Sequence, residues 1–137
     1  MNYWILKTEP STYSFDDLKR EKTAAWDGVK NPLALKHLRA MERGDLVLVY
    51  HTGDEKAVIG RARVTRTAYP DPKKKDEKLV VVDLAAGSLL AAPVTLAAIK
   101  ADPAFRDLAL VRMPRLSVQP ASAEQWKRLL KLGGTSV

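Results

Sequence analysis

The spacing of its apolar segments limits the fold of this 137-residue chain more than any other feature. Residues 45–50 form an apolar run that is too short for a helix and is typical of a strand buried on both faces. Residues 58–65 and 78–84 alternate apolar and polar side chains, so each predicts a half-buried strand, and residues 1–7 predict an opening strand. Long helices do not alternate with these strands, which argues against a Rossmann-like sheet.

Short helices are predicted between the strands because capping residues recur along the chain. Five helix starts are expected, at Ser14, Asn31, Thr95, Asp102 and Ser122. Residues 108–111 and 116–118 are predicted as two short strands separated by Pro114. This order indicates an α+β fold, in which a small closed or nearly closed β-barrel is flanked by short helices.

Length and composition predict one domain over residues 1–137 in the cytoplasm. The chain has no cysteine, which excludes disulfides, a thiolate nucleophile and cysteine-ligated metals, and which fits a reducing compartment. The N-terminal residues lack the features of a signal peptide, and no apolar segment approaches the roughly 18 residues that span a bilayer. We therefore expect no membrane partner.

The net charge of +7 is unevenly distributed, since residues 51–137 carry +6 of it. Such a surplus is typical of proteins that bind a phosphate backbone, although it also suits a merely solubilising surface. The predicted phosphate contacts are two arginines on the outward side of residues 58–65, three lysines in the loop of residues 69–78, and one later arginine: Arg61, Arg63, Lys73, Lys74, Lys75 and Arg115.

Motifs of catalysis or of cofactor binding are not found, and we expect no cofactor. The two histidines, His37 and His51, lack the carboxylate spacing of a metal site, so no metal is expected. Reading a base that is turned out of its stack requires a flat wall with donors and acceptors, and Lys7, Thr8, Trp26 and Asn31 supply these types. Each also has a simpler interpretation: Trp26 as core, Asn31 as a helix cap, and Lys7 as surface.

Seven stretches of the chain resemble the EVE domain family, in order and over nearly its whole length. They are residues 3–18, 26–31, 38–41, 44–45, 50–51, 68–72 and 110–118. The resemblance implies a PUA-like fold, a small β-barrel flanked by helices. It also implies a non-catalytic domain that binds a modified base of DNA or RNA in an aromatic-walled pocket. The expected partner is thus a nucleic acid, and the oligomeric state stays open, with a monomer expected.

The resemblance also implies roles for individual residues. Lys7 and Thr8 would form the pocket floor and Trp26 a wall. A polar rim and a far side complete the implied site: Asn31, His51 and Thr52 on the rim, and Arg112, Pro114, Leu116 and Ser117 opposite. The chain departs from the family pattern at three positions: Thr8 in place of serine, Pro32 in place of tyrosine, and Leu35 in place of arginine. The last two put the identity of the bound base in doubt.

An enzymatic alternative comes from the wider PUA-like group, where ASCH-domain amidohydrolases act on modified cytidine through a lysine, a threonine and a glutamate. Lys7, Thr8 and Glu9 are residues of these types. Adjacent residues of a strand point to opposite faces, so Thr8 is expected to point away from the other two. The spacing therefore favours a binding domain over an amidohydrolase.

Overall fold

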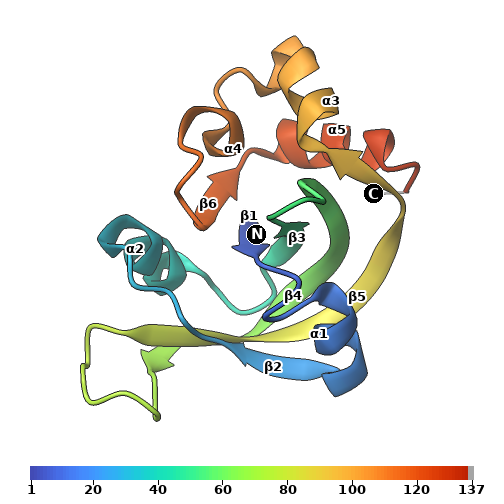
Figure 1. Cartoon of the computed structure of the whole chain (residues 1–137). Coiled ribbons are helices and arrows are strands. Elements are labelled where there is room, and N and C mark those ends of the chain that lie inside the picture. The colour runs from blue at the N-terminus through green and yellow to red at the C-terminus, as the bar shows by residue number, and fades with distance from the viewer. Residues whose placement is uncertain (136–137) are drawn as a thin grey trace.

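Six strands form one mixed sheet in the computed structural model, which describes residues 1–135 (Figure 1). The strands are β1 (Tyr3–Thr8), β2 (Thr23–Trp26), β3 (Leu46–His51), β4 (Ala57–Pro70), β5 (Val80–Thr95) and β6 (Val118–Ala121). Their order across the sheet is β2-β5-β4-β3-β1-β6. Strands β1 and β3 are parallel, and the other four neighbouring pairs are antiparallel.

Five α-helices and one 3-10 helix, η1, accompany the sheet. They are α1 (Phe15–Glu21), α2 (Pro32–Ala40), α3 (Leu96–Ala101), η1 (Pro103–Phe105), α4 (Ala109–Arg112) and α5 (Ala123–Leu132). All five predicted capping residues are confirmed, because each side chain accepts a hydrogen bond from a backbone N–H in the first turn. Within residues 1–135, no helix has both the length and the apolar character that crossing a membrane requires.

Both faces of the sheet are buried at its centre. Along β1, Trp4 and Leu6 belong to one cluster of buried side chains, while Ile5 between them belongs to a second cluster. The side chains of β3 also alternate between the two clusters, as expected for a strand, whose side chains repeat every two residues. Helices α1 and α2 complete the first cluster, and α3, η1, α4 and α5 complete the second. The prediction of a doubly buried strand at residues 45–50 is therefore confirmed.

The sheet curves strongly but does not close into a barrel. Strands β4 and β5 run side by side through a long curved hairpin, and register shifts interrupt their pairing at four places (Figure 1). Such irregularities bend a strand and increase its twist. Among the described strands, β2 and β6 remain the two edges. The mixed α+β fold is confirmed, and a fully closed barrel is not formed.

Of the two short strands predicted late in the chain, the one at residues 108–111 is wrong, and the one at residues 116–118 is displaced, since β6 begins at Val118. Residues 109–112 form helix α4 rather than a strand, because the N–H groups of Arg112 and Met113 bond back to the carbonyls of Leu108 and Ala109. A short apolar run does not distinguish a buried helix from a strand by its periodicity. Strand β2 was missed because Thr23–Trp26 is only four residues long and carries two alanines, and pairing with β5 makes it a strand.

Candidate nucleic-acid interface

A pocket of about 530 Å³ lies where β1, β2 and the loop after β4 approach one another. Its wall combines two aromatic rings with hydroxyl, carboxylate and amine groups. The lining residues are Lys7, Thr8, Thr12, Tyr13, Glu21, Ala24, Ala25, Trp26, Asp27, Gly28, Val29, Asp71, Pro72, Lys73, Val81 and Ser117. The volume suits a small flat ligand, since ligand pockets usually measure about 300–1,000 Å³.

The aromatic part of the wall consists of Tyr13 and Trp26. Their ring centroids lie 6.0 Å apart at an interplanar angle of 86°, which is an edge-to-face pair. The hydroxyl of Tyr13 donates to Oε1 of Glu21 at 2.6 Å. Burial and this carboxylate both raise the pKa of Tyr13 well above its usual range. Tyr13 therefore remains a neutral hydroxyl whose proton is directed at Glu21.

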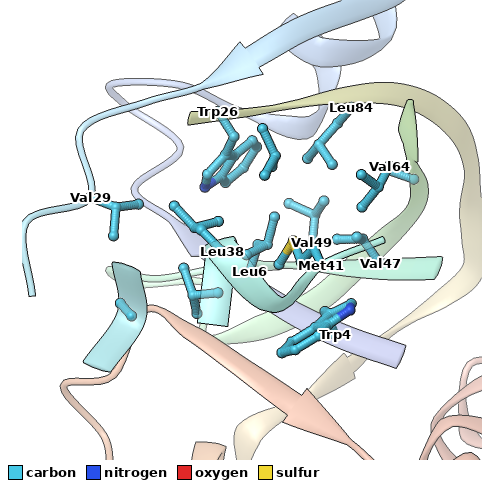
Figure 2. Packing of buried hydrophobic residues seen from close by; sticks show 14 of the residues in the cluster. Trp4, Leu6, Trp26, Val29, Leu38, Met41, Val47, Val49, Val64 and Leu84 are labelled. Atoms are coloured by element: carbon cyan, nitrogen blue, oxygen red, sulfur yellow. The ribbon is translucent and has the colours of Figure 1, made fainter. Parts of the chain in front are cut away.

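Trp26 is both core and pocket wall, so the two interpretations left open by the sequence both apply. The residue closes β2, pairs with Val82 of β5, and is only 6% exposed. Figure 2 shows its ring in the same cluster of buried side chains as Leu38 and Leu84. Trp26 is also one of the residues that line the pocket. Truncating Trp26 is thus expected to affect stability as well as binding.

The chain turns sharply after Trp26 and leads into α2. Gly28 lines the pocket with a φ of +78°, a conformation that residues with a side chain rarely adopt. Asn31 then caps α2, its Oδ1 accepting from the N–H of Ala34 at 3.0 Å. Asn31 is not among the pocket-lining residues, so its predicted contact with a base has no geometric support beyond its proximity in sequence.

The end of β1 contributes Lys7 and Thr8 to the lining of this pocket. They pair with Tyr50 and His51 of β3, so their side chains point to opposite faces of the sheet. The N–H of Lys7 donates to the Ser117 carbonyl at 2.9 Å, and its Nζ donates to the Pro114 carbonyl at 2.5 Å. Burial lowers the pKa of Lys7. The two hydrogen bonds of Lys7, to Ser117 and Pro114, hold the loop before β6 against β1.

The hydroxyl of Thr8 donates to the backbone carbonyl of Tyr13 at 2.7 Å. This bond fixes the turn between β1 and α1, and so the position of the Tyr13 ring. Compared with the serine of the family pattern, threonine adds a methyl group at this position but keeps the hydroxyl that makes the bond. Thr8 accordingly supports the aromatic wall in addition to lining the pocket.

Two residues of the predicted polar rim, His51 and Thr52, make their hydrogen bonds away from the pocket. Nε2 of His51 accepts from the N–H of Phe15 at 3.0 Å, and its Nδ1 lies 2.8 Å from Oε1 of Glu55. The hydroxyl of Thr52 contacts the Thr8 carbonyl at 3.3 Å. Both residues therefore anchor the start of α1 and the turn after β3, and neither lines the pocket.

The predicted far side is brought only partly to the pocket. Ser117 lines it, whereas Leu116 is 4% exposed and packs in the first core cluster. Pro114 acts through its carbonyl on Lys7, and Arg112 lies 3.6 Å from Asp107 at the surface. These three residues shape the loop that carries Ser117 without lining the pocket themselves.

The predicted phosphate contacts divide into separate groups. Lys73 lines the pocket, and Lys74 and Lys75 follow it in the exposed loop between β4 and β5. Arg115 is exposed in the loop before β6. Arg61 and Arg63 instead border a different pocket of about 300 Å³, together with side chains of α5. The second group is therefore not part of the wall of the larger pocket.

Several lining residues were not predicted. Tyr13 lies within a stretch that resembles the EVE family, so the resemblance offered a signal for it. Asp71 also lies within such a stretch, residues 68–72. Glu21 gave no such signal, because a carboxylate in a helix is ordinary on a surface. Within residues 1–135, no three histidine, aspartate or glutamate side chains are grouped so as to hold a metal ion.

Fold and site together define a small mixed α+β domain whose strand ends surround a partly aromatic, partly charged pocket. The model of the EVE domain family matches residues 2–132, and the chain belongs to this family. Mouse thymocyte nuclear protein 1 is 29% identical over 98% of this chain and 74% of its own length.

Two solved structures illustrate the similarity. Rpa0253 from Rhodopseudomonas palustris is 46% identical, with a TM-score of 0.92 over 98% of this chain and 94% of that one. The human THYN1 protein, solved in complex with DNA that contains 5-methylcytosine, is 27% identical, with a TM-score of 0.89 over 100% of both chains.

Proposed function

We propose that this chain is a non-catalytic nucleic-acid-binding domain that holds a modified base of DNA or RNA in the pocket of Tyr13 and Trp26. The observation that carries the proposal is this pair of rings, set beside carboxylates and hydroxyls in a pocket of about 530 Å³. A base turned out of its stack requires a flat apolar surface for its ring and polar partners for its edge. The human relative in complex with 5-methylcytosine DNA supports modified cytosine as the first base to test.

The polar lining offers partners for both kinds of group on a base edge. Glu21, Asp27 and Asp71 are acceptors for exocyclic amino groups, and Thr12 and Ser117 have hydroxyls that donate or accept. Asn31, His51, Thr52, Arg112, Pro114 and Leu116, which the family resemblance implies for the site, act in this proposal by supporting the walls. Phosphates next to the base would be held by Lys73, Lys74, Lys75 and Arg115.

The amidohydrolase alternative requires Lys7, Thr8 and Glu9 to cooperate, and their geometry does not favour this. The amine of Lys7 is bonded to the Pro114 carbonyl, and the hydroxyl of Thr8 to the Tyr13 carbonyl. The carboxylate of Glu9 accepts from Ser11 and Thr52 and does not line the pocket. Binding without turnover is therefore the better-supported function.

The proposal is tested with a panel of modified and unmodified nucleosides, and with duplexes that carry one modified base. We expect saturable binding that favours a modified base, and no chemical change when acylated or alkylated cytidines are incubated with the protein. Conversion of any cytidine derivative would favour the amidohydrolase. Equal affinity for modified and unmodified bases would contradict the proposal.

The wall is tested by Trp26→Ala, with Trp126→Ala as the matched control. Both tryptophans are buried, at 6% and 2% exposure, so each change is expected to cost about 3–5 kcal/mol of stability. Trp126 lies in the second core cluster and does not line the pocket. Base–aromatic stacking contributes about 1–3 kcal/mol, and only Trp26→Ala should lose this much nucleoside binding.

Melting temperatures and nucleoside affinities are measured for both variants at a temperature where each is folded. Equal affinities for the two folded variants would show that Trp26 does not contact the base. In that case Tyr13→Leu would decide whether any ring of this wall stacks on it.

A further inference from the structure

The formal charge of the pocket is opposite in sign to that of the whole chain. Its lining carries three carboxylates, Glu21, Asp27 and Asp71, against the two amines of Lys7 and Lys73. The lining side chains therefore carry a formal charge of −1, in a protein whose net charge is +7. A site that receives phosphate is expected to be positive, so the pocket itself is better suited to a cation.

The two amines compensate the carboxylates only in part. The Nζ of Lys7 donates to the Pro114 carbonyl at 2.5 Å and lies 5.7 Å from the centroid of the Tyr50 ring. Neither Pro114 nor Tyr50 lines the pocket, so this amine is already engaged with groups outside the lining. Lys73 is exposed in the loop between β4 and β5, where water and salt screen its charge.

Glu21 places a carboxylate beside the aromatic rings. Its Oε1 accepts from the Tyr13 hydroxyl at 2.6 Å, and Tyr13 is the edge-to-face partner of Trp26. One such hydrogen bond leaves a carboxylate most of its acceptor capacity. Arg20, the neighbour of Glu21 in α1, is paired with Asp17 and does not line the pocket. Glu21 is therefore available to a cation that stacks on these rings.

Asp71 is a buried carboxylate of the same lining. It is 5% exposed, and its Oδ1 accepts from the N–H of Lys73 at 2.9 Å. A charge that is removed from water is screened less, so it attracts a cation more strongly than a surface carboxylate does. In the part of the chain that the structure describes, residues 1–135, acidic and histidine side chains do not gather in threes to hold a metal ion. The negative charge of the pocket thus suits an organic cation.

A base becomes such a cation when one of its ring nitrogens is methylated. N3-methylcytosine and N1-methyladenine carry a positive charge at neutral pH, spread over a flat ring. The face of an aromatic side chain attracts a cation, and a nearby carboxylate attracts it further. The added methyl group also blocks Watson–Crick pairing, and a damaged or unpaired base costs least to turn out of its stack.

We propose that the pocket of Tyr13 and Trp26 selects cationic bases that are methylated on a ring nitrogen, with Glu21 and Asp71 as the groups that distinguish them from neutral modified bases. This inference rests on the proposed function, which assigns a modified base to the pocket without specifying its charge. Neutral bases such as 5-methylcytosine stack on the same rings and bind more weakly.

The test compares nucleosides of the same shape and different charge. N3-methylcytidine is a cation and N3-methyluridine is neutral, and the two differ only where an amino group replaces a carbonyl oxygen. 1-Methyladenosine and 1-methylinosine form a second pair of the same kind. We expect each cation to bind roughly tenfold or more tightly than its neutral partner, and N3-methylcytidine to bind more tightly than its isomer 5-methylcytidine. Cytidine and uridine, both neutral, control for the amino group.

Glu21→Gln tests the charge on the protein, with Glu124→Gln as the matched control. Both changes remove one negative charge from an exposed side chain, and glutamine keeps an oxygen that can accept from the Tyr13 hydroxyl. Glu124 lies in α5 and does not line the pocket. Glu21→Gln should reduce the preference for N3-methylcytidine over N3-methyluridine roughly fivefold, and Glu124→Gln should leave it unchanged. Asp71→Asn repeats the comparison at the buried carboxylate, at a temperature where melting curves show the variant to be folded.

Equal affinities within both methylated pairs, with their members still preferred over cytidine, would overturn this inference and leave the proposed function intact. A preference no greater than that of cytidine over uridine would also overturn it, because the amino group would then explain the difference. The same loss of preference in Glu21→Gln and Glu124→Gln would assign the effect to the charge of the whole protein and overturn it too. If the native protein binds no modified nucleoside more tightly than the unmodified ones, the proposed function itself fails.

Discussion

Asp45 joins the N-terminus to the turn before β3. It is 1% exposed, and its carboxylate accepts from the indole N–H of Trp4 at 2.9 Å and from the N–H groups of Asn2 and Glu42 at 3.0 and 2.9 Å. Burial alone would raise its pKa, but these hydrogen bonds outweigh it, and the pKa lies below its ordinary value of 3.8. Asp45 is therefore a charged carboxylate in the folded protein at neutral pH.

Replacing Asp45 with asparagine is expected to lower the free energy of unfolding at pH 7 by about 1–3 kcal/mol, because donors in a buried site lose a charged acceptor. Since the folded pKa is depressed, the carboxylate stabilises the protein above pH 3.8 and loses this effect as the pH falls through the lower folded value. Urea unfolding of the native protein and the variant at pH 7 and at pH 2–3 measures this.

The difference between the native protein and the variant should shrink in acid. Other carboxyl groups with lowered pKa values, such as those of Asp17 and Asp102, remain in both proteins, so the difference isolates Asp45. A difference that is the same at both pH values would show that its charge is not what stabilises the fold.

At the scale of elements, Gly60 of β4 allows α1 to pack closely against the sheet. A Cβ added to Gly60 would lie 2.5 Å from Cζ of the Phe15 ring, closer than atoms of a folded protein approach. Phe15 is the first residue of α1 and is 1% exposed. The register of β4 also shifts on both sides of Gly60, where the strand bends around the helix. The glycine thus permits a close contact between α1 and the sheet.

Gly60→Ala is expected to cost about 1–3 kcal/mol of stability, because the core must move to accept the extra methyl group. It should also weaken nucleoside binding, since α1 carries Glu21 and follows directly after Tyr13 in the pocket wall. In a Phe15→Leu background the smaller side chain relieves the clash, so the same change should cost less. A double-mutant cycle by chemical unfolding measures the coupling, and additive effects would contradict this account.

At the scale of the whole molecule, much of the positive charge lies in β4 and in the loop between β4 and β5. Lys73, Lys74 and Lys75 occupy this loop, and Arg61, Arg63 and Arg66 lie along β4. Each phosphate that a cation neutralises releases counterions, so affinity depends on the number of contacts and on salt. The charge is expected to act on affinity more than on the choice of base.

Affinity for a 20-base-pair duplex should therefore fall steeply as salt rises. If all six predicted phosphate contacts form, the slope of log affinity against log salt is about −5, a loss of about 10³ between 50 and 200 mM. Titrations of duplex and of free modified nucleoside over this range measure it. The nucleoside carries no phosphate and should bind almost independently of salt. A flat plot for the duplex would contradict every phosphate contact proposed here.

The caps at Ser14, Asn31 and Ser122 and the two-residue alternation of the strands were determined by the sequence itself. These features depend on groups within about four residues of one another, so local chemistry decides them. The family resemblance supplied Lys7 and Trp26 as candidate lining residues in the same way, through motifs that read along the chain.

Only the tertiary structure decided what these residues face. Lys7 and Pro114 are 107 positions apart, and no local pattern predicts that an amine and a carbonyl so distant will bond. Strand β2 exists because β5 pairs with it, and through this pairing Trp26 becomes core as well as pocket wall. Shifts in register along β4 and β5 accompany the curvature of their hairpin. Pairing and curvature are set by packing between distant segments, which no short stretch of sequence contains.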